Sequence, residues 1–287
     1  MGSSPHQRRK LNKSLIASII YHDIFDYPLT FDELNKWKLI TKKINGKGQV
    51  ENDGKYYYLK GRESLVEKRI SREKYFQRKL AIANEVATWF YRIPTIRMVA
   101  VTGSLAMNNT RLGSDIDLMI ITRKGTLWTT RLITYYLLLV TGFKLRRAGE
   151  GWEKDKLCLN IWMDESNLKF KIYNSEFRNM FVAHELSQII PLVNKSRTYE
   201  KLLTKNKWIV DYWPKATVIR NNKQLLQSNN ANNYDFIFSL FESFAFWLQK
   251  QYMRKKITNE VITSTRAFFH PVDWSEKVKK ELDKRGL

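Results

Sequence analysis

The sequence predicts an α+β fold in which helices flank a small mixed β-sheet. Apolar residues recur at helical spacing over much of the chain, most clearly in the long stretch Arg62–Tyr91. Two short apolar runs have the length of buried strands: Met98–Val101, and the run around Asp115 and Asp117 that ends at Ile121. We expect three parts, namely residues 1–61, a core with its leading helix at 62–173, and a helical C-terminal region at 174–287.

Two helices are expected at the start of the chain. Leu11–Phe25 has apolar residues at helical spacing, and Pro28 stops this helix. Thr30 stands three positions before Glu33, which predicts a capping box that opens a second short helix.

A β-hairpin is expected next. Asp53-Gly54 is a turn signal that precedes the aromatic run Lys55–Leu59. Two helices and a hairpin resemble a winged-helix module, but the stretch between Lys43 and Gln49 is too short for a third, recognition helix. The sequence leaves open whether this truncated segment reads DNA or only packs against the core, because fold resemblance does not establish function.

The second half of the core should add a helix and two strands. Thr126–Thr141 is predicted as a helix ended by Gly142, and Phe143–Arg146 as a strand. Lys156–Met163 alternates as a half-buried strand does. One side of this strand should carry Leu157, Leu159, Ile161 and Met163, and the other Cys158, Asn160 and Trp162.

The C-terminal region is expected to be mostly helical. A helix capped by Asn174 or Ser175 should run to Ile190 and end at Pro191. The remaining expectations are a helix at Thr198–Tyr212, an Asn-rich loop at Asn221–Asn233, and a helix from Tyr234 to about Met253 that is apolar on most sides and therefore buried or interfacial.

The chain is strongly basic, with 50 Lys and Arg against 28 Asp and Glu, a formal net charge of +22 and a pI near 9.9. Such an excess favours polyanionic partners, with RNA or DNA first and an anionic membrane surface second. The alternative is an ordinary solvated surface. Hydrophobic residues at 43% argue against a disordered chain.

Cysteine content and the N-terminus indicate a cytoplasmic protein. Cys158 is the single cysteine, which excludes an intrachain disulfide framework and a zinc cluster built on cysteines. Met1–Lys13 is polar and basic, unlike a signal peptide, and Met1–Ser4 is typical of an expression leader. We expect no transmembrane segment, and the sequence does not determine the oligomeric state.

The most informative stretch is Val101–Ile121. Asp115 and Asp117 are separated by one residue in an expected strand, so their carboxylates should share one face while Ile116 and Leu118 face the core. Oxygen ligands of this kind suit Mg²⁺ or Mn²⁺, which usually share them with substrate phosphates. A Gly103-Ser104 turn precedes this pair and could bring backbone N–H groups close to such phosphates.

Gly103-Ser104, a polar loop and Ser114-Asp115-Ile116-Asp117 together resemble the signature of the DNA polymerase β-like nucleotidyltransferase superfamily. The resemblance implies an NTP substrate, two-metal catalysis by Asp115 and Asp117, and a nucleotide site at Gly103, Ser104 and Ser114. The reaction would move a nucleoside monophosphate to an acceptor hydroxyl, here favoured to be on nucleic acid, with release of pyrophosphate.

One departure from that pattern concerns the third carboxylate that the superfamily adds from a later strand. Strand parity places the neutral Asn160 at this position, so Asn160 is the third candidate catalytic residue. Glu185, His184 or Gln188 on the following helix could substitute for it, although a core role is favoured for His184. The second hypothesis is therefore a catalytically impaired protein of this fold that binds nucleic acid or a partner.

Overall fold

The structure is a computed structural model that describes residues 11–44, 49–146, 153–217, 225–228, 238, 240–254, 260–269 and 274–284. Several expectations lie outside these residues: the leader Met1–Ser4, most of the Asn-rich stretch Asn221–Asn233, and the start of a helix at Tyr234.

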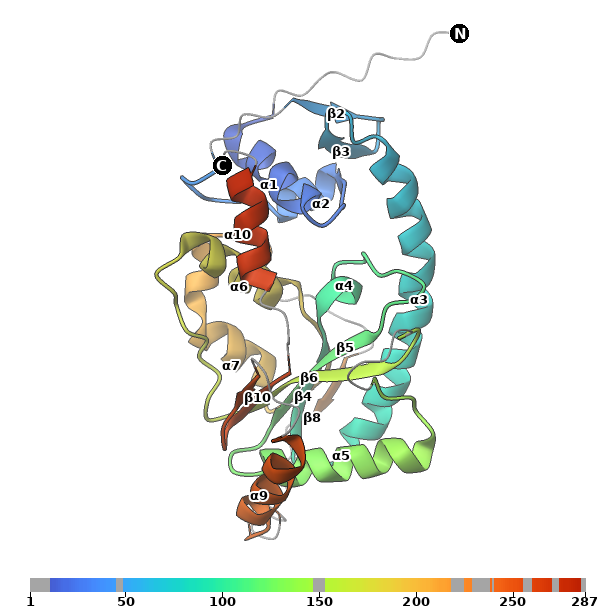
Figure 1. Cartoon of the computed structure of the whole chain (residues 1–287), viewed down its shortest axis with the longest axis vertical. Coiled ribbons are helices and arrows are strands. Elements are labelled where there is room, and N and C mark those ends of the chain that lie inside the picture. Colours follow the sequence, from blue (N-terminus) through green and yellow to red (C-terminus); the bar gives the residue numbers. More distant parts are fainter. Residues whose placement is uncertain are drawn as a thin grey trace.

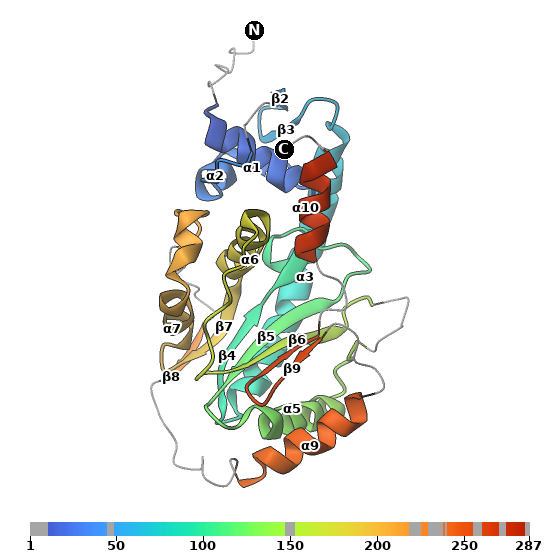
Figure 2. The same cartoon turned by 60° about the vertical axis from the view of Figure 1, so that its left-hand side comes forward.

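The expected α+β class is confirmed, with a mixed sheet at the centre and helices on both faces (Figures 1 and 2). The seven strands have the order β8-β7-β4-β5-β6-β10-β9. They are β4 (Ile96–Val101), β5 (Ile116–Thr122), β6 (Leu157–Asp164), β7 (Ile190–Lys195), β8 (Leu226–Ser228), β9 (Val261–Ile262) and β10 (Arg266–Phe268). The β5–β6 and β7–β8 pairs are parallel and the other pairs are antiparallel.

Each face of the sheet builds its own apolar core. One face packs against α3 (Ser64–Tyr91), α5 (Leu127–Thr141) and α9 (Glu242–Met253). The other packs against α6 (Glu176–Gln188), α7 (Thr198–Lys205) and α10 (Trp274–Lys284). Side chains of β5 alternate between the two cores, since Leu118 and Ile120 join the first and Met119 and Ile121 the second.

The N-terminal segment has the truncated winged-helix layout. It contains α1 (Lys13–Asp23), β1 (Leu29–Thr30), α2 (Phe31–Lys36), β2 (Val50–Asn52) and β3 (Tyr56–Leu59), with the strands in the order β1-β3-β2. The capping box is confirmed, because the Glu33 N–H donates to Thr30 Oγ1 at 3.2 Å and the Thr30 N–H donates to Glu33 Oε2 at 2.9 Å. No helix occurs among the described residues between α2 and β2.

This segment is a packing element of the molecule. Its buried side chains, such as Ile20 and Leu34, belong to the same apolar cluster as Met119 and Ile121 of the sheet. The burial of these side chains ties the segment to the sheet through the hydrophobic effect.

The region after residue 173 contains strands as well as helices, which corrects the expectation of a helical region. Strands β7, β8, β9 and β10 all lie there and join the same sheet as β4 and β5. Pro191 does not merely follow a helix, because it lies inside β7 opposite Ala100. β8 pairs with β7 only from Val193 onward, so the missing N–H of Pro191 lies where the strand has one neighbour.

Two smaller expectations are also corrected. Phe143–Arg146 forms only an isolated bridge, between Leu145 and Leu157, instead of a strand. Helix α9 is not buried on most sides: Ala245 and Gln249 face α5, while Phe244 and Trp247 are 60% and 56% exposed. Among the helices that the structure describes, none has both the length and the apolar composition needed to cross a bilayer.

Candidate metal and nucleotide site

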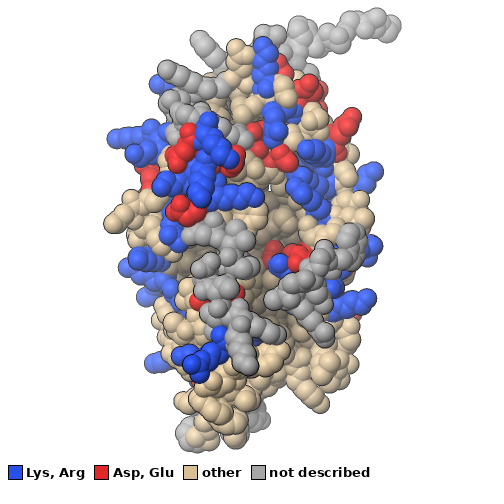
Figure 3. All heavy atoms as spheres, viewed as in Figure 1, with Lys and Arg blue, Asp and Glu red and all other residues tan. Residues whose placement is uncertain are grey.

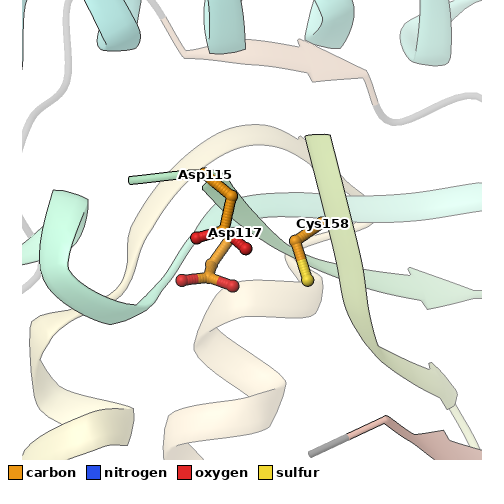
Figure 4. Close-up of side chains that lie close together, drawn as sticks. All are labelled: Asp115, Asp117 and Cys158. Atoms are coloured by element: carbon orange, nitrogen blue, oxygen red, sulfur yellow. The ribbon is translucent and has the colours of Figure 1, made fainter. Parts of the chain in front are cut away.

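Strand β5 brings Asp115 and Asp117 to one face of the sheet, as the sequence predicted. Asp115 immediately precedes the strand and Asp117 is its second residue. Ile116 and Leu118, on the other face, are fully buried in the core under α3 and α5. The two carboxylates lie together in Figure 4, and the side chain of Cys158 points to the same side from the neighbouring strand.

The Gly103-Ser104 turn packs directly against this acidic pair. Gly103 has φ of +60°, and a Cβ atom built there would lie 2.5 Å from Asp117 Oδ2, so only glycine fits. The Thr102 N–H also donates to the carbonyl of Asp117 at 3.0 Å. Gly103 and Ser104 then begin the short helix α4 (Gly103–Ala106) beside the carboxylates.

Ser114 shapes the loop that leads into β5. Its Oγ accepts a hydrogen bond from the Arg111 N–H at 3.1 Å, and its carbonyl accepts one from the buried ammonium of Lys79. The hydroxyl therefore closes the loop on itself. A direct contact of Ser114 with nucleotide stays a prediction.

Asn160 lies beside the acidic pair, where strand parity placed it. Asn160 Nδ2 donates to Asp117 Oδ1 at 2.6 Å. The alternation of β6 breaks next to it, because the register with β5 shifts between Asp117 and Met119. Trp162 consequently faces the core with Leu157 and Leu159, while Ile161 and Met163 face the opposite core, which corrects the expected side for these three residues.

Cys158 is a site residue that the sequence reasoning did not propose. It pairs with Asp117 in the parallel β5–β6 register. One ligand atom from each of Asp115, Asp117 and Cys158 lies within 4.8 Å of the other two. Strand parity had placed Cys158 on the same side as Asn160, but parity alone does not reveal which residue stands opposite Asp117.

Arg146 is the second residue that was missed. Its Nη1 lies 2.9 Å from Asp115 Oδ2 and 3.8 Å from Cys158 Sγ, and its Nε lies 2.6 Å from Glu153 Oε1. The side chain is 37% exposed. Arg146 therefore places one positive charge at the edge of the site, where it can also meet an incoming anion.

The site lacks positive charge at its centre. Burial, and then the charge of Asp115, raise the pKa of Asp117 to about 8. Burial and the same two carboxylates raise the pKa of the Cys158 thiol. Two polar atoms on this face, Asn160 Oδ1 and Thr102 Oγ1, are buried without a hydrogen-bond partner. Clustered acidic ligands and unpartnered polar atoms fit a bound divalent cation.

The other candidates divide into near and distant residues. Glu185 is close enough for its charge to contribute to the raised pKa of Asp117, after burial and Asp115. His184 is buried, with its Nε2 3.3 Å from His22 Nε2, in an aromatic cluster. Asp164, the carboxylate that β6 itself carries, lies at the far end of the strand, where it accepts hydrogen bonds from the Gly125 and Ser166 N–H groups.

Comparison with models of known protein families, with curated proteins and with solved structures found no match to this chain.

Proposed function

We propose that this protein is a metal-dependent nucleotidyltransferase that moves a nucleoside monophosphate from an NTP to an acceptor hydroxyl and releases pyrophosphate. The observation that supports this most strongly is the contact of the Gly103 turn with Asp117, which places a glycine backbone directly beside the pair of carboxylates. The same combination, in the same order along the chain, is what resembles the polymerase β-like superfamily.

In this proposal Asp115 and Asp117 hold Mg²⁺ or Mn²⁺. Such ions stabilise the charge that develops on the attacking and leaving oxygens of an in-line displacement at phosphorus. The backbone at Gly103 and the hydroxyl of Ser104 bind the triphosphate. Asn160 positions the carboxylate of Asp117, to which its amide already donates. Arg146 turns from Asp115 toward a phosphate oxygen, which its partial exposure allows.

The proposed acceptor is the hydroxyl of a nucleic acid. The formal charge of +22 supports this, and Figure 3 shows Lys and Arg side chains gathered mainly on the upper part and along the two sides of the face drawn there. Fewer charged side chains lie over α5 and α9 in that view.

We expect the affinity for RNA or DNA to fall by about tenfold or more between about 50 and 200 mM salt, measured by fluorescence anisotropy, because phosphate contacts release counterions. A response independent of salt would remove nucleic acid as the acceptor.

The alternative function is a non-catalytic module of the same fold that binds nucleic acid or a partner. Asn160, in place of a third carboxylate, favours this alternative. The ion pair between Arg146 and Asp115 also favours it, because it uses one of the two carboxylates that a metal would need.

Activity measurements separate the two functions. The protein is incubated with labelled NTPs, Mg²⁺ or Mn²⁺, and RNA or DNA acceptors, beside the variants Asp115→Asn and Asp117→Asn. The matched control is Asp32→Asn, which removes one charge at an exposed position of α2. We expect transfer by the wild type and the control, and a loss of at least about 100-fold in both site variants. Absence of transfer by the wild type, with nucleic-acid binding unchanged in the site variants, would leave the binding module.

A further inference from the structure

We propose that Cys158 is a third side-chain ligand of the metal centre formed by Asp115 and Asp117, and that its sulfur makes this centre prefer thiophilic divalent cations to Mg²⁺. Co²⁺, Zn²⁺ and Cd²⁺ are such cations. The inference rests on the metal site of the proposed function, but it concerns which ion is held and by which atoms.

The positions of the three side chains suit one ion. The ligand atoms of Asp115, Asp117 and Cys158 lie within 4.8 Å of one another. Ligands of one ion lie about 3 to 4.5 Å apart, because each oxygen or sulfur binds it at about 2.0 to 2.3 Å. Small side-chain rotations therefore suffice, without movement of the paired strands β5 and β6.

A second observation points to a ligand at the same place. Asn160 is only 4% exposed, and its Oδ1 has no hydrogen-bond partner although its Nδ2 bonds to Asp117 Oδ1. An unpartnered buried oxygen is costly. The two ends of an amide are nearly equivalent in shape, so a rotated Asn160 offers an oxygen to an ion held by Asp117.

The surroundings of Cys158 are those of a ligand. A cysteine that only fills space lies among apolar groups. Cys158 is instead partly exposed and stands between the Asp117 carboxylate and the Arg146 guanidinium. Sulfur binds Mg²⁺ poorly and binds softer ions well, so this position selects among cations. When such an ion is bound, the thiol proton passes to the buffer.

Absorption spectroscopy of the Co²⁺-loaded or Cd²⁺-loaded full-length protein tests this inference without measuring activity. Cys158 is the single cysteine of the chain, so any thiolate-to-metal charge-transfer band belongs to it. We expect a saturable band in the wild type, absent in Cys158→Ser. We also expect Cys158→Ser to lower the Cd²⁺ affinity by about tenfold or more and the Mg²⁺ affinity by much less.

Two further variants complete the test. Cys158→Asp supplies an oxygen ligand and should shift the preference from Cd²⁺ toward Mg²⁺. The double variant Asp115→Asn/Asp117→Asn should lose the band although Cys158 is retained. Urea unfolding of each variant shows whether it has folded.

The outcomes distinguish this inference from the proposed function. A band that is lost in Cys158→Ser and in the double aspartate variant, in a protein without transferase activity, supports the inference and contradicts the proposed function. Nucleotidyl transfer supported by Mg²⁺, with no charge-transfer band and with equal metal affinities in wild type and Cys158→Ser, overturns the inference and leaves the proposed function intact.

Discussion

At the scale of single residues, the site depends on the close approach of Gly103 to Asp117. A Cβ atom at position 103 would lie 2.5 Å from Asp117 Oδ2, and the backbone there has φ of +60°. We predict that Gly103→Ala destabilises the protein by about 2 to 4 kcal/mol, of which about 1 kcal/mol reflects the left-handed backbone and the rest the clash. The variant should also bind divalent cations more weakly, because the Asp117 carboxylate is displaced.

Gly142→Ala is the matched control for this prediction. Gly142 ends α5 with φ of +76°, and a Cβ there meets no atom within 4 Å. The control should therefore show only the backbone cost and unchanged metal affinity. Urea unfolding and calorimetric titration with Mn²⁺ measure the two effects. Equal losses in both variants would mean that glycine is required at position 103 only for its backbone angle and not for its contact with Asp117.

Residue types predicted part of the site and strand register explains the rest. Gly103, Asp115 and Asp117 followed from their spacing, and Asn160 from strand parity. Cys158 did not, because its role depends on which residue of β6 stands opposite Asp117, next to a register shift. Arg146 did not, because its role depends on an ion pair with Asp115, which is distant in the sequence. A shift of this kind arises from packing on both faces of β6, as the burial of Trp162 with Leu159 shows, and no local pattern encodes it.

At the scale of elements, helix α3 holds the loop that delivers Asp115. The ammonium of Lys79, 1% exposed, donates to the carbonyls of Ser114 at 2.5 Å and Leu112 at 3.4 Å and pairs with Asp155 at 3.0 Å. We predict that Lys79→Met costs about 2 to 4 kcal/mol, because it removes the buried ammonium from two partly buried carbonyls and leaves Arg78 as the charged partner of Asp155. Metal affinity should fall with it, since the loop before β5 loses its anchor.

The exposed Lys74 on the same helix provides the control. Lys74→Met removes the same charge from a solvated position and should change the free energy of unfolding by less than about 0.5 kcal/mol. Urea unfolding gives both values, and Mn²⁺ titration shows whether the loop has loosened. If Lys79→Met were as stable as Lys74→Met, the ammonium would not anchor the loop.

The elements were predicted best where their signals are local. Periodicity identified α1, α3 and α5, and the capping box of Thr30 and Glu33 identified the start of α2. Strands β8, β9 and β10 were missed because each has only two or three residues, and β7 because its partners β4 and β8 lie far away in the chain. Pro191 also argued against a strand at β7, because proline is tolerated in a strand only where one edge of that strand lacks a neighbour.

At the scale of the whole molecule, a pair of buried histidines joins the N-terminal segment to the helices beside the sheet. His22 of α1 and His184 of α6 have their Nε2 atoms 3.3 Å apart. His22 Nδ1 lies 2.7 Å from the Ser18 carbonyl and therefore carries a proton, so His22 Nε2 accepts from His184 Nε2–H. Tyr21, Trp37 and Trp213 pack around His184. Both rings are neutral in this arrangement.

The neutral pair makes the stability of the protein depend on pH. Burial, above all, lowers the pKa of His22 to about 3 and that of His184 to about 3. Both lie below the unfolded value near 6.5, so between these values the unfolded chain binds protons that the folded protein does not. The stabilisation is complete above about pH 6.5 and is lost as the pH falls, by on the order of 2 kcal/mol for each histidine at pH 5.

Urea unfolding at pH 7 and pH 5 measures this dependence, and a variant isolates its source. His184→Gln keeps a donor toward His22 but cannot be protonated, so it should be less stable than the wild type at pH 7 yet lose about half as much stability on acidification. The charges of Lys36 and Glu33 on α2 also influence the pKa values of the pair. Glu185 Oε1 lies 3.7 Å from His184 Nδ1, so Glu185→Gln tests whether this carboxylate alters the dependence of stability on pH. An unchanged pH dependence in His184→Gln would assign the acid sensitivity to other groups. A reduced one would show that the uncharged histidine pair, which joins the N-terminal segment to α6, contributes to the acid sensitivity of the protein.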